Sequence, residues 1–363
     1  MRGLISIYLD LLRFLAALGV FLWHAGSLAS LPGVLPVIYF NHTLVILFFV
    51  ISGFVIAASA ARPDRTLVNY AADRVTRLSV VVIPALALTY LLGIAGLMVS
   101  PELYANINPH WQGLRFLANL LYCQQLWGLC VNPFNNNPFW SLGYEFWYYV
   151  LFGIWIFVRS KTVKFGLILT VSLLVGPKIL LLFPAWVVGA LAFHAGKSWK
   201  WSNAASWLSF GISGLAMLAV LFYGREMGLE NGRAGQAPWY YSSNFMGDNV
   251  FAVIVALNFL GCALLGKHLK TDFDSWRLVR VIRWLAGHTF SLYLYHVPII
   301  VGIRAVTKYD PRNPYAVWGA VALTLVIIAG LAKVTEEKYP KLRILSRQYL
   351  AKMTGRLPIA KIS

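Results

Sequence analysis

The chain has 363 residues, of which 59% are hydrophobic and only 12% are charged, and its mean hydropathy is +0.67. An ordinary soluble domain carries about 25% charged residues, so this composition excludes a soluble protein and predicts a polytopic membrane protein. The net charge of +18 does not indicate a nucleic-acid partner, because the Lys and Arg residues lie between apolar segments and form no basic patch with interleaved aromatic residues. This distribution is typical of loops beside anionic lipids.

About ten apolar segments are expected to cross the bilayer as α-helices, because backbone that faces lipid must satisfy its own hydrogen bonds. The predicted fold class is therefore all-α, with a membrane domain over residues 1–335 and a basic cytoplasmic tail over 336–363. The predicted spans are 4–25, 36–59, 79–99, 138–158, 163–177, 179–196, 204–222, 248–266, 284–305 and 315–333. The first is interpreted as a retained span and not as a signal peptide, because Asp10 and Arg13 interrupt it.

The loops predict how the chain is oriented in the membrane. If the N-terminus is cytoplasmic, 23 of the 31 Lys and Arg residues fall on the cytoplasmic side, seven fall on the other side, and Arg13 lies within a span. Cytoplasmic loops of membrane proteins carry an excess of Lys and Arg. Both termini are therefore expected to be cytoplasmic.

The first span carries three ionisable side chains, which are costly inside a bilayer and normally face a protein interior or a wet cavity. Asp10, Arg13 and His24 are spaced so that they lie near one face of a helix. At about 1.5 Å per residue, Arg13 and His24 are roughly 16–17 Å apart along that face. We interpret this stripe as an interior polar track. The alternative is an Asp10–Arg13 pair near the inner headgroups, with His24 at the membrane interface.

The next two spans carry a packing motif and a basic motif. Ser52 and Gly53 are small residues, which usually mark a close helix contact in a membrane. Arg74 and Arg77 lie three residues apart at the inner mouth of the third span, where two guanidinium groups can grip a phosphate. The alternative for this pair is topological anchoring of the span.

The segment 100–137 falls on the outer side and is polar and aromatic. Its part from 111 to 127 is expected to form an interfacial or re-entrant helix. Cys123 and Cys130 would be able to pair if this segment faces an oxidising compartment. The three cysteines form no metal motif, and no metal is expected.

The fourth and ninth spans add further candidates for a site. Glu145 is an acidic side chain inside a span and needs polar partners, for which Ser141, Tyr148 or an arginine from another helix are candidates. The alternative is a structural hydrogen bond between helices. His296 is another histidine inside a span and is therefore a candidate for the site. The alternative is a packed, hydrogen-bonded histidine with a structural role only.

Five segments, taken together and in this order, resemble the motifs of the membrane acyltransferase-3 family. They are spread over nearly the whole chain, and the set is far more specific than any one of them. The segments are Leu9-Asp10-Leu11-Leu12-Arg13 with His24, Phe48-Phe49-Val50-Ile51-Ser52-Gly53-Phe54, Arg74-Val75-Thr76-Arg77-Leu78, Trp140-Ser141-Leu142-Gly143-Tyr144-Glu145-Phe146-Trp147-Tyr148, and Phe290-Ser291-Leu292-Tyr293-Leu294-Tyr295-His296-Val297-Pro298. One departure is Asp73, since many members have an arginine before the position of Arg74.

The resemblance implies the activity, the donor and the location. It implies a bacterial inner-membrane O-acyltransferase, although other kingdoms also use the fold; such enzymes take an acyl group, usually acetyl, from cytoplasmic acyl-CoA. They place it on a hydroxyl of a surface glycan such as lipopolysaccharide, exopolysaccharide, peptidoglycan or a lipo-oligosaccharide. The expected partners are the lipid bilayer, acetyl-CoA or another acyl-CoA as co-substrate, and a glycan or glycolipid acceptor. Larger members add an extracytoplasmic hydrolase-like domain, which this chain is not expected to contain.

The resemblance also assigns roles to residues. The catalytic and donor-binding positions of the family are matched by Arg13, His24, Arg74, Arg77 and Glu145. We expect the arginines to hold acyl-CoA and His24 either to take the proton of the acceptor hydroxyl or to carry the acyl group transiently. The residues expected to contact the substrate are Asp10, Trp140, Ser141, Tyr148 and His296.

Another class of function also fits ionisable groups inside spans. A transporter or flippase for a glycan or lipid-linked substrate needs such groups, but it tends to show internal repeats or broken helices in both halves of the chain. The sequence shows no such symmetry. This favours the acyltransferase over a transporter, and the cost of the intramembrane charges argues against a non-catalytic scaffold.

Overall fold

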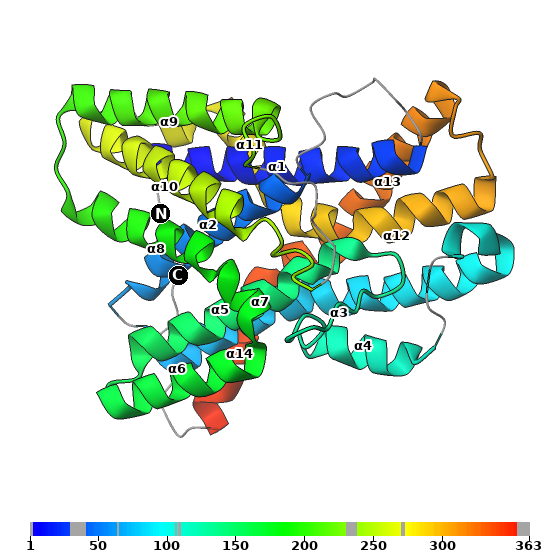
Figure 1. Ribbon diagram of the computed structural model, residues 1–363, viewed down its shortest axis with the longest axis horizontal. Helices are drawn as coiled ribbons and strands as arrows, with labels where there is room; N and C mark the ends of the chain where they lie inside the picture. The colour runs from blue at the N-terminus through cyan, green and yellow to red at the C-terminus, as the bar shows by residue number, and fades with distance from the viewer. Residues whose placement is uncertain are drawn as a thin grey trace.

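A computed structural model describes residues 3–29, 41–63, 65–105, 107, 110–229, 238–269 and 273–353. Within these residues the chain is helical and contains no β-strand. Most of the long helices run in roughly the same direction and lie side by side (Figure 1). The all-α class predicted from the sequence is confirmed.

Each predicted span corresponds to a helix or to a consecutive pair of helices. These are α1 (Leu4–Ala29), α2 (Asn41–Ala60), α3 (Leu67–Val99), α5 (Trp140–Phe157), α6 (Lys161–Val175), α7 (Pro177–Leu181) with α8 (Phe183–Ser198), α9 (Asn203–Tyr223), α10 (Phe245–His268), α12 (Thr289–Thr307) and α13 (Pro314–Val334). The other helices are α4 (Gln112–Leu120), α11 (Arg277–Ala286) and α14 (Tyr339–Met353), with the 3-10 helices η2 (Pro101–Tyr104), η3 (Asn137–Phe139), η4 (Phe273–Ser275) and η5 (Glu336–Lys338).

Eight of the described helical segments are long and apolar enough to cross a membrane, two fewer than the ten that the sequence predicts. The two that fall short are α5 and α6. Helix α6 has only 15 residues, and α5 contains Glu145 among several Tyr and Trp residues, which lowers its hydropathy. Residues 36–40 of the second predicted span and 354–363 of the predicted tail lie outside the described residues.

The segment 100–137, which the sequence predicts to lie on the outer side, differs from its predicted structure in two ways. The helix expected over 111–127 is the shorter α4, which ends at Leu120. Cys123 and Cys130 are both free thiols, so the pairing considered for them is wrong for this structure. The Cys123 thiol donates to the Leu121 carbonyl oxygen, and the Cys130 sulfur accepts from the Gln125 amide.

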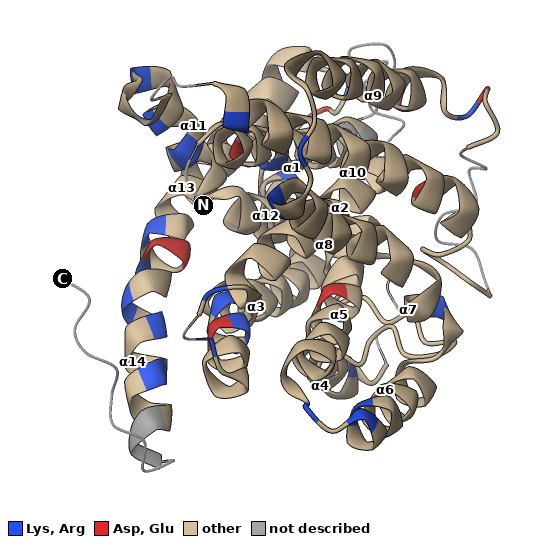
Figure 2. Ribbon diagram, turned by 90° about the vertical axis from the view of Figure 1, so that its left-hand side faces the viewer, with Lys and Arg blue, Asp and Glu red and all other residues tan. Residues whose placement is uncertain are grey.

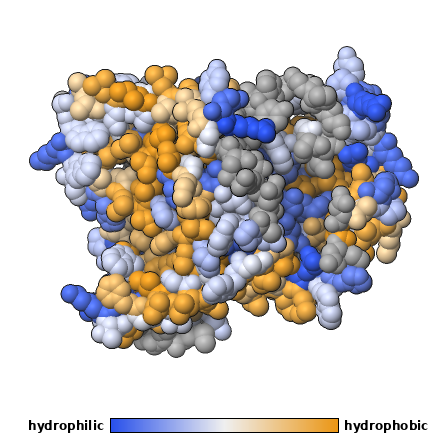
Figure 3. Space-filling model, viewed as in Figure 1, coloured by the Kyte–Doolittle hydropathy of each residue, from blue (hydrophilic) through white to orange (hydrophobic). Residues whose placement is uncertain are grey.

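The surface of the bundle is suited to lipid. Leu208, Ile212 and Leu215 lie at helical spacing on α9 and are 63–70% exposed. Figure 3 shows broad hydrophobic areas on this face, with strongly hydrophilic side chains gathered mainly toward the left and right edges, where the helices of Figure 1 end. Large exposed apolar areas of this kind are rare on soluble monomers. The protein is therefore a multi-pass membrane protein.

Basic side chains gather at one end of the bundle. Figure 2 looks at the left-hand end of Figure 1 and shows Lys and Arg on α3, α6, α11 and α14. This is the end that the sequence assigns to the cytoplasm, because Lys and Arg accumulate in cytoplasmic loops.

Helices α2 and α8 cross at two glycines. A Cβ atom on Gly53 would lie 1.9 Å from the Trp186 carbonyl oxygen, and one on Gly189 would lie 2.1 Å from the Val50 carbonyl oxygen. The two backbones therefore touch directly, as small residues allow between membrane helices. This confirms the packing interpretation for Gly53. Ser52 takes part in the same contact, because its hydroxyl accepts a hydrogen bond from the Trp186 indole of α8 at 3.2 Å, and this hydroxyl also belongs to the polar site described below.

Gly53→Ala is expected to destabilise the fold by about 1–3 kcal/mol, because the added methyl group must push the two helices apart. Thermal unfolding of the purified protein in detergent, followed by circular dichroism, measures the effect. Gly166→Ala on α6 is the matched control, because a Cβ atom there would meet no atom within 4 Å. An unchanged melting temperature for Gly53→Ala would contradict the close crossing.

Helix α14 is fixed to α3 by a cluster of ion pairs. Asp73 of α3 is fully buried, and its carboxylate lies 2.7 Å from Arg65, 2.9 Å from Arg343 and 2.6 Å from Arg347. A buried carboxylate needs such partners. The residue that departs from the family pattern therefore has a structural role, since it holds part of the predicted tail against the bundle.

Asp73→Asn is expected to loosen α14, because the amide removes the charge that three arginines share. Breaking a buried ion pair costs about 3–5 kcal/mol, and the partial exposure of Arg343 and Arg347 lowers the expected cost here to about 2 kcal/mol. Limited digestion with trypsin should then cleave α14 roughly tenfold faster than in the wild type. Asp310→Asn, in an exposed loop, is the control. Equal digestion of the two variants would show that other contacts hold α14.

Candidate active site

A cavity of about 320 Å³ lies between helices of the bundle and brings together three arginines. Arg13 comes from α1, whereas Arg74 and Arg77 come from the first turns of α3. The polar side chains that line the cavity also include Ser52, Ser141, Glu145, Tyr149, Tyr293 and Tyr339. The arginines and the glutamate that the sequence predicts as site residues thus share one cavity.

Two of the three arginines already have an acidic partner. Arg13 lies 3.4 Å from Asp10 on the same helix. The sequence offered this ion pair as the alternative to an interior polar track, but Arg13 also lines the cavity. Arg77 lies 2.7 Å from Glu336, and its guanidinium group is 5.3 Å from the ring centroid of Tyr339. Residues of the predicted tail therefore complete the wall of the cavity, a contribution for which the sequence carries no motif.

Arg74 is the arginine best placed to hold a further anion. Its Nε atom is buried and has no hydrogen-bond partner among the described residues. Its guanidinium group lies 5.9 Å from the ring centroid of Tyr149. A buried donor without a partner is costly, so an anionic group in the cavity would be stabilised there. The residues present therefore fit an anionic ligand.

Glu145 is held by hydroxyl groups. Ser52 of α2 donates to its carboxylate at 2.7 Å, and Tyr149, one turn further along α5, donates to the same oxygen. Two of the candidate partners do not bond to Glu145, because the Tyr148 hydroxyl donates to the Ile179 carbonyl oxygen at 2.9 Å and the Ser141 hydroxyl donates to the Pro138 carbonyl oxygen at 3.2 Å. The spacing of four residues between Glu145 and Tyr149 is the signal that sequence reasoning could have used.

The other predicted substrate contacts divide between the cavity and the core. Ser141 lines the cavity, and its hydroxyl lies 2.9 Å from that of Tyr293. Trp140 is buried and stacks on Tyr241, with the ring centroids 4.3 Å apart. Trp140, Tyr148 and Asp10 are not among the described residues that line the cavity. Their role in substrate binding stays a prediction.

The two intramembrane histidines lie together. The Nε2 atom of His296 on α12 is 3.1 Å from the Nδ1 atom of His24 on α1. Neither ring is among the described residues of the cavity lining, but Tyr293, one turn before His296, is, and its ring centroid lies 6.5 Å from that of His296. The first helix therefore leads from Arg13 in the cavity to the histidine pair, roughly 16–17 Å further along.

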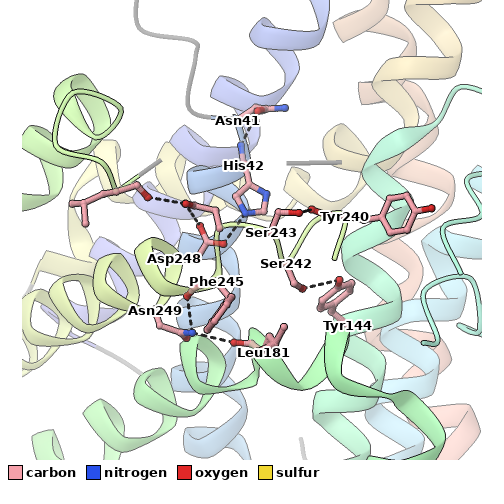
Figure 4. Close-up of polar contacts among 12 residues, drawn as sticks. Asn41, His42, Tyr144, Leu181, Tyr240, Ser242, Ser243, Phe245, Asp248 and Asn249 are labelled. Atoms are coloured by element: carbon pink, nitrogen blue, oxygen red, sulfur yellow. Dashed lines mark hydrogen bonds and ion pairs between the residues drawn. The ribbon is translucent and has the colours of Figure 1, made fainter. Parts of the chain in front are cut away.

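Outside this site, a second polar network joins α2 to α10. The Nε2 atom of His42 lies 3.0 Å from the Asp248 carboxylate (Figure 4). The Asn244 side-chain amide donates to the same carboxylate at 3.2 Å. All three side chains are buried, and the His42 ring stacks on Trp140. The network fixes the start of the helix that carries Ser52.

Comparison with known proteins decides the family. A family model described as "Acyltransferase domain" matches residues 6–333. The chain belongs to the membrane acyltransferase-3 family. The O-acetyl transferase of Shigella phage Sf6 is 27% identical to this acyltransferase over 241 residues, which is 60% of this chain and 70% of the phage protein. No solved structure matches this acyltransferase significantly.

An acyltransferase needs a place for its donor and a group that prepares its acceptor. Guanidinium groups bind phosphates and other anions through charge-assisted hydrogen bonds. Imidazole rings accept protons near neutral pH and act as bases or nucleophiles. In this acyltransferase the two kinds of group are separate, with the arginines in the cavity and the histidine pair formed by His24, further along the first helix, and His296 of α12.

Proposed function

We propose that this acyltransferase moves an acyl group, acetyl in the first place, from cytoplasmic acyl-CoA to a hydroxyl of an extracytoplasmic glycan or glycolipid in the bacterial inner membrane. The observation that carries the proposal is the convergence of Arg13, Arg74 and Arg77 on one cavity, which the first helix connects to His24. The similarity to a phage O-acetyl transferase supports acetyl as the group transferred.

The donor would enter from the basic end of the bundle. Arg74 and Arg77 would bind its phosphates, and the buried Nε atom of Arg74 supplies a donor that lacks a partner among the described residues. Arg13 lines the same cavity and would contact the pantetheine arm or the thioester carbonyl. The distance of roughly 16–17 Å from Arg13 to His24 is comparable with an extended pantetheine arm. A donor held inside would thus present its thioester near the outer face.

The acceptor would react beside His24. His24 would take the proton of the hydroxyl, or would carry the acyl group first and pass it on. Glu145 would keep the polar wall of the cavity in shape through Ser52 and Tyr149. No step in this scheme needs CoA itself to cross the membrane, because only the acyl group changes sides.

Membrane vesicles of known orientation test the proposal. Labelled acetyl-CoA is supplied to the cytoplasmic or to the opposite face, and covalently labelled glycan is then separated from free label. We expect transfer only with donor at the cytoplasmic face, and only in vesicles that contain the protein. Transfer from the opposite face would overturn the assigned sidedness. Movement of a glycan or lipid without covalent labelling would overturn the acyltransferase scheme in favour of a transporter.

A further inference from the structure

We propose that His296 is a positioning residue that holds the Nδ1–H group of His24 and thereby makes the Nε2 atom of His24 the reactive one. This inference rests on the proposed function, in which His24 prepares the acceptor. It differs from the substrate contact that the sequence predicts for His296, and it follows from the hydrogen bonds of the two rings.

The hydrogen bonds of His296 determine which of its nitrogens carries the proton. Its Nδ1 atom lies 2.9 Å from the Leu292 carbonyl oxygen. A carbonyl oxygen only accepts, so the Nδ1 atom carries the hydrogen, and in a neutral ring the Nε2 atom then carries the lone pair. A charged ring would be costly, because His296 is fully buried and its hydrogen-bond partners are the backbone of Leu292 and Tyr293 and another imidazole.

The same reasoning then applies to His24. Its Nδ1 atom lies 2.9 Å from the Val20 carbonyl oxygen and 3.1 Å from the Nε2 atom of His296. Both neighbours are acceptors, so the Nδ1 atom of His24 carries the hydrogen and its Nε2 atom carries the lone pair. Val20 belongs to the same helix turn, whereas His296 reaches in from α12. The contact from a second helix fixes the direction of the ring as well as its tautomer.

A neutral partner suits a site inside a bilayer. In a soluble hydrolase the base is oriented by a carboxylate, which stabilises the imidazolium ion as it forms. A carboxylate in a membrane interior is costly. Two neutral imidazoles carry no net charge at rest, and a positive charge appears on the pair only while the acceptor proton is held.

The transfer step can be written with this pair. The acceptor hydroxyl gives its proton to the Nε2 atom of His24, while its oxygen forms a bond to the thioester carbonyl carbon. The carbon–sulfur bond then breaks, and the CoA sulfur takes the proton back from Nε2. Throughout the step, His296 accepts the hydrogen bond from the Nδ1–H group of His24, so it contacts no reacting atom.

Two substitutions of His296 separate positioning from packing. His296→Leu fills the space but removes the acceptor, and His296→Gln keeps an acceptor oxygen near the position of Nε2. We expect His296→Leu to lower kcat about 100-fold, within the range for general-base catalysis, with the KM for acyl-CoA changed less than twofold. The kcat of His296→Gln should be at least tenfold higher than that of His296→Leu. Full kcat in His296→Leu, or equal losses in two folded variants, would overturn the proposal.

A spectroscopic measurement tests the tautomer without relying on transfer. The chain has seven histidines, so the ¹⁵N signals of His24 in labelled protein are assigned by their absence in His24→Ala. We expect the Nδ1–H tautomer in the wild type and a changed Nδ1 shift in His296→Leu. An Nε2–H tautomer in the wild type would overturn the inference. Should His24→Ala keep full activity, the proposed role of His24 would fail while the tautomer result still stands on its own.

Discussion

His24→Ala is expected to lower the turnover number of acyl transfer by about 10²–10⁴-fold, because this range is what a general base contributes. The KM for acyl-CoA should stay close to the wild-type value, since the imidazole is outside the described cavity lining and roughly 16–17 Å along the helix from Arg13. Initial rates of label transfer in vesicles, at matched protein levels and varied donor concentration, separate the two parameters.

A matched control for this experiment is His194→Ala on α8, because His194 is an exposed histidine of another helix. It should transfer at the wild-type rate. Rapid quenching of the wild type then distinguishes the two roles of His24, since an acylated histidine would retain label on the protein before the acceptor is added. Wild-type turnover in His24→Ala would contradict both roles and leave His24 as a structural residue.

Arg74→Ala is expected to raise the KM for acyl-CoA by about 10–100-fold while kcat changes only a few-fold. A hydrogen bond to a charged group contributes about 1.5–3 kcal/mol, and about 1.4 kcal/mol corresponds to tenfold in affinity. Arg74 is a cleaner choice than Arg77, because removal of Arg77 would leave the buried Glu336 carboxylate without its ion-pair partner. Initial rates and displacement of labelled CoA measure the effect.

Arg62→Ala serves as the control for charge, because Arg62 is an exposed arginine shortly before α3. A donor without phosphates, S-acetylpantetheine, adds a second control. It should react equally poorly with the wild type and Arg74→Ala, because the contact that distinguishes them is absent. Equal KM values for acetyl-CoA in the wild type and Arg74→Ala would remove Arg74 from the donor site.

The sequence by itself determined the features that depend on neighbouring residues. Runs of apolar residues predict helices, because a backbone that faces lipid must form its hydrogen bonds within its own segment. Of the predicted spans, only the weakly apolar α5 and the short α6 are not long and apolar enough to count as membrane-spanning helices. The spacing of Asp10 and Arg13 on one helix predicts their contact, which the structure confirms.

Contacts between distant helices were decided only by the tertiary structure. Ser52 and Glu145 are 93 residues apart, and His24 and His296 are 272 apart. Periodicity shows which face of a helix is polar, but not which other helix that face meets. That choice depends on how the helices cross, as where Gly53 lets α2 touch α8. Because hydrogen bonds require separations near 3 Å, these partners are defined only once the whole bundle has packed.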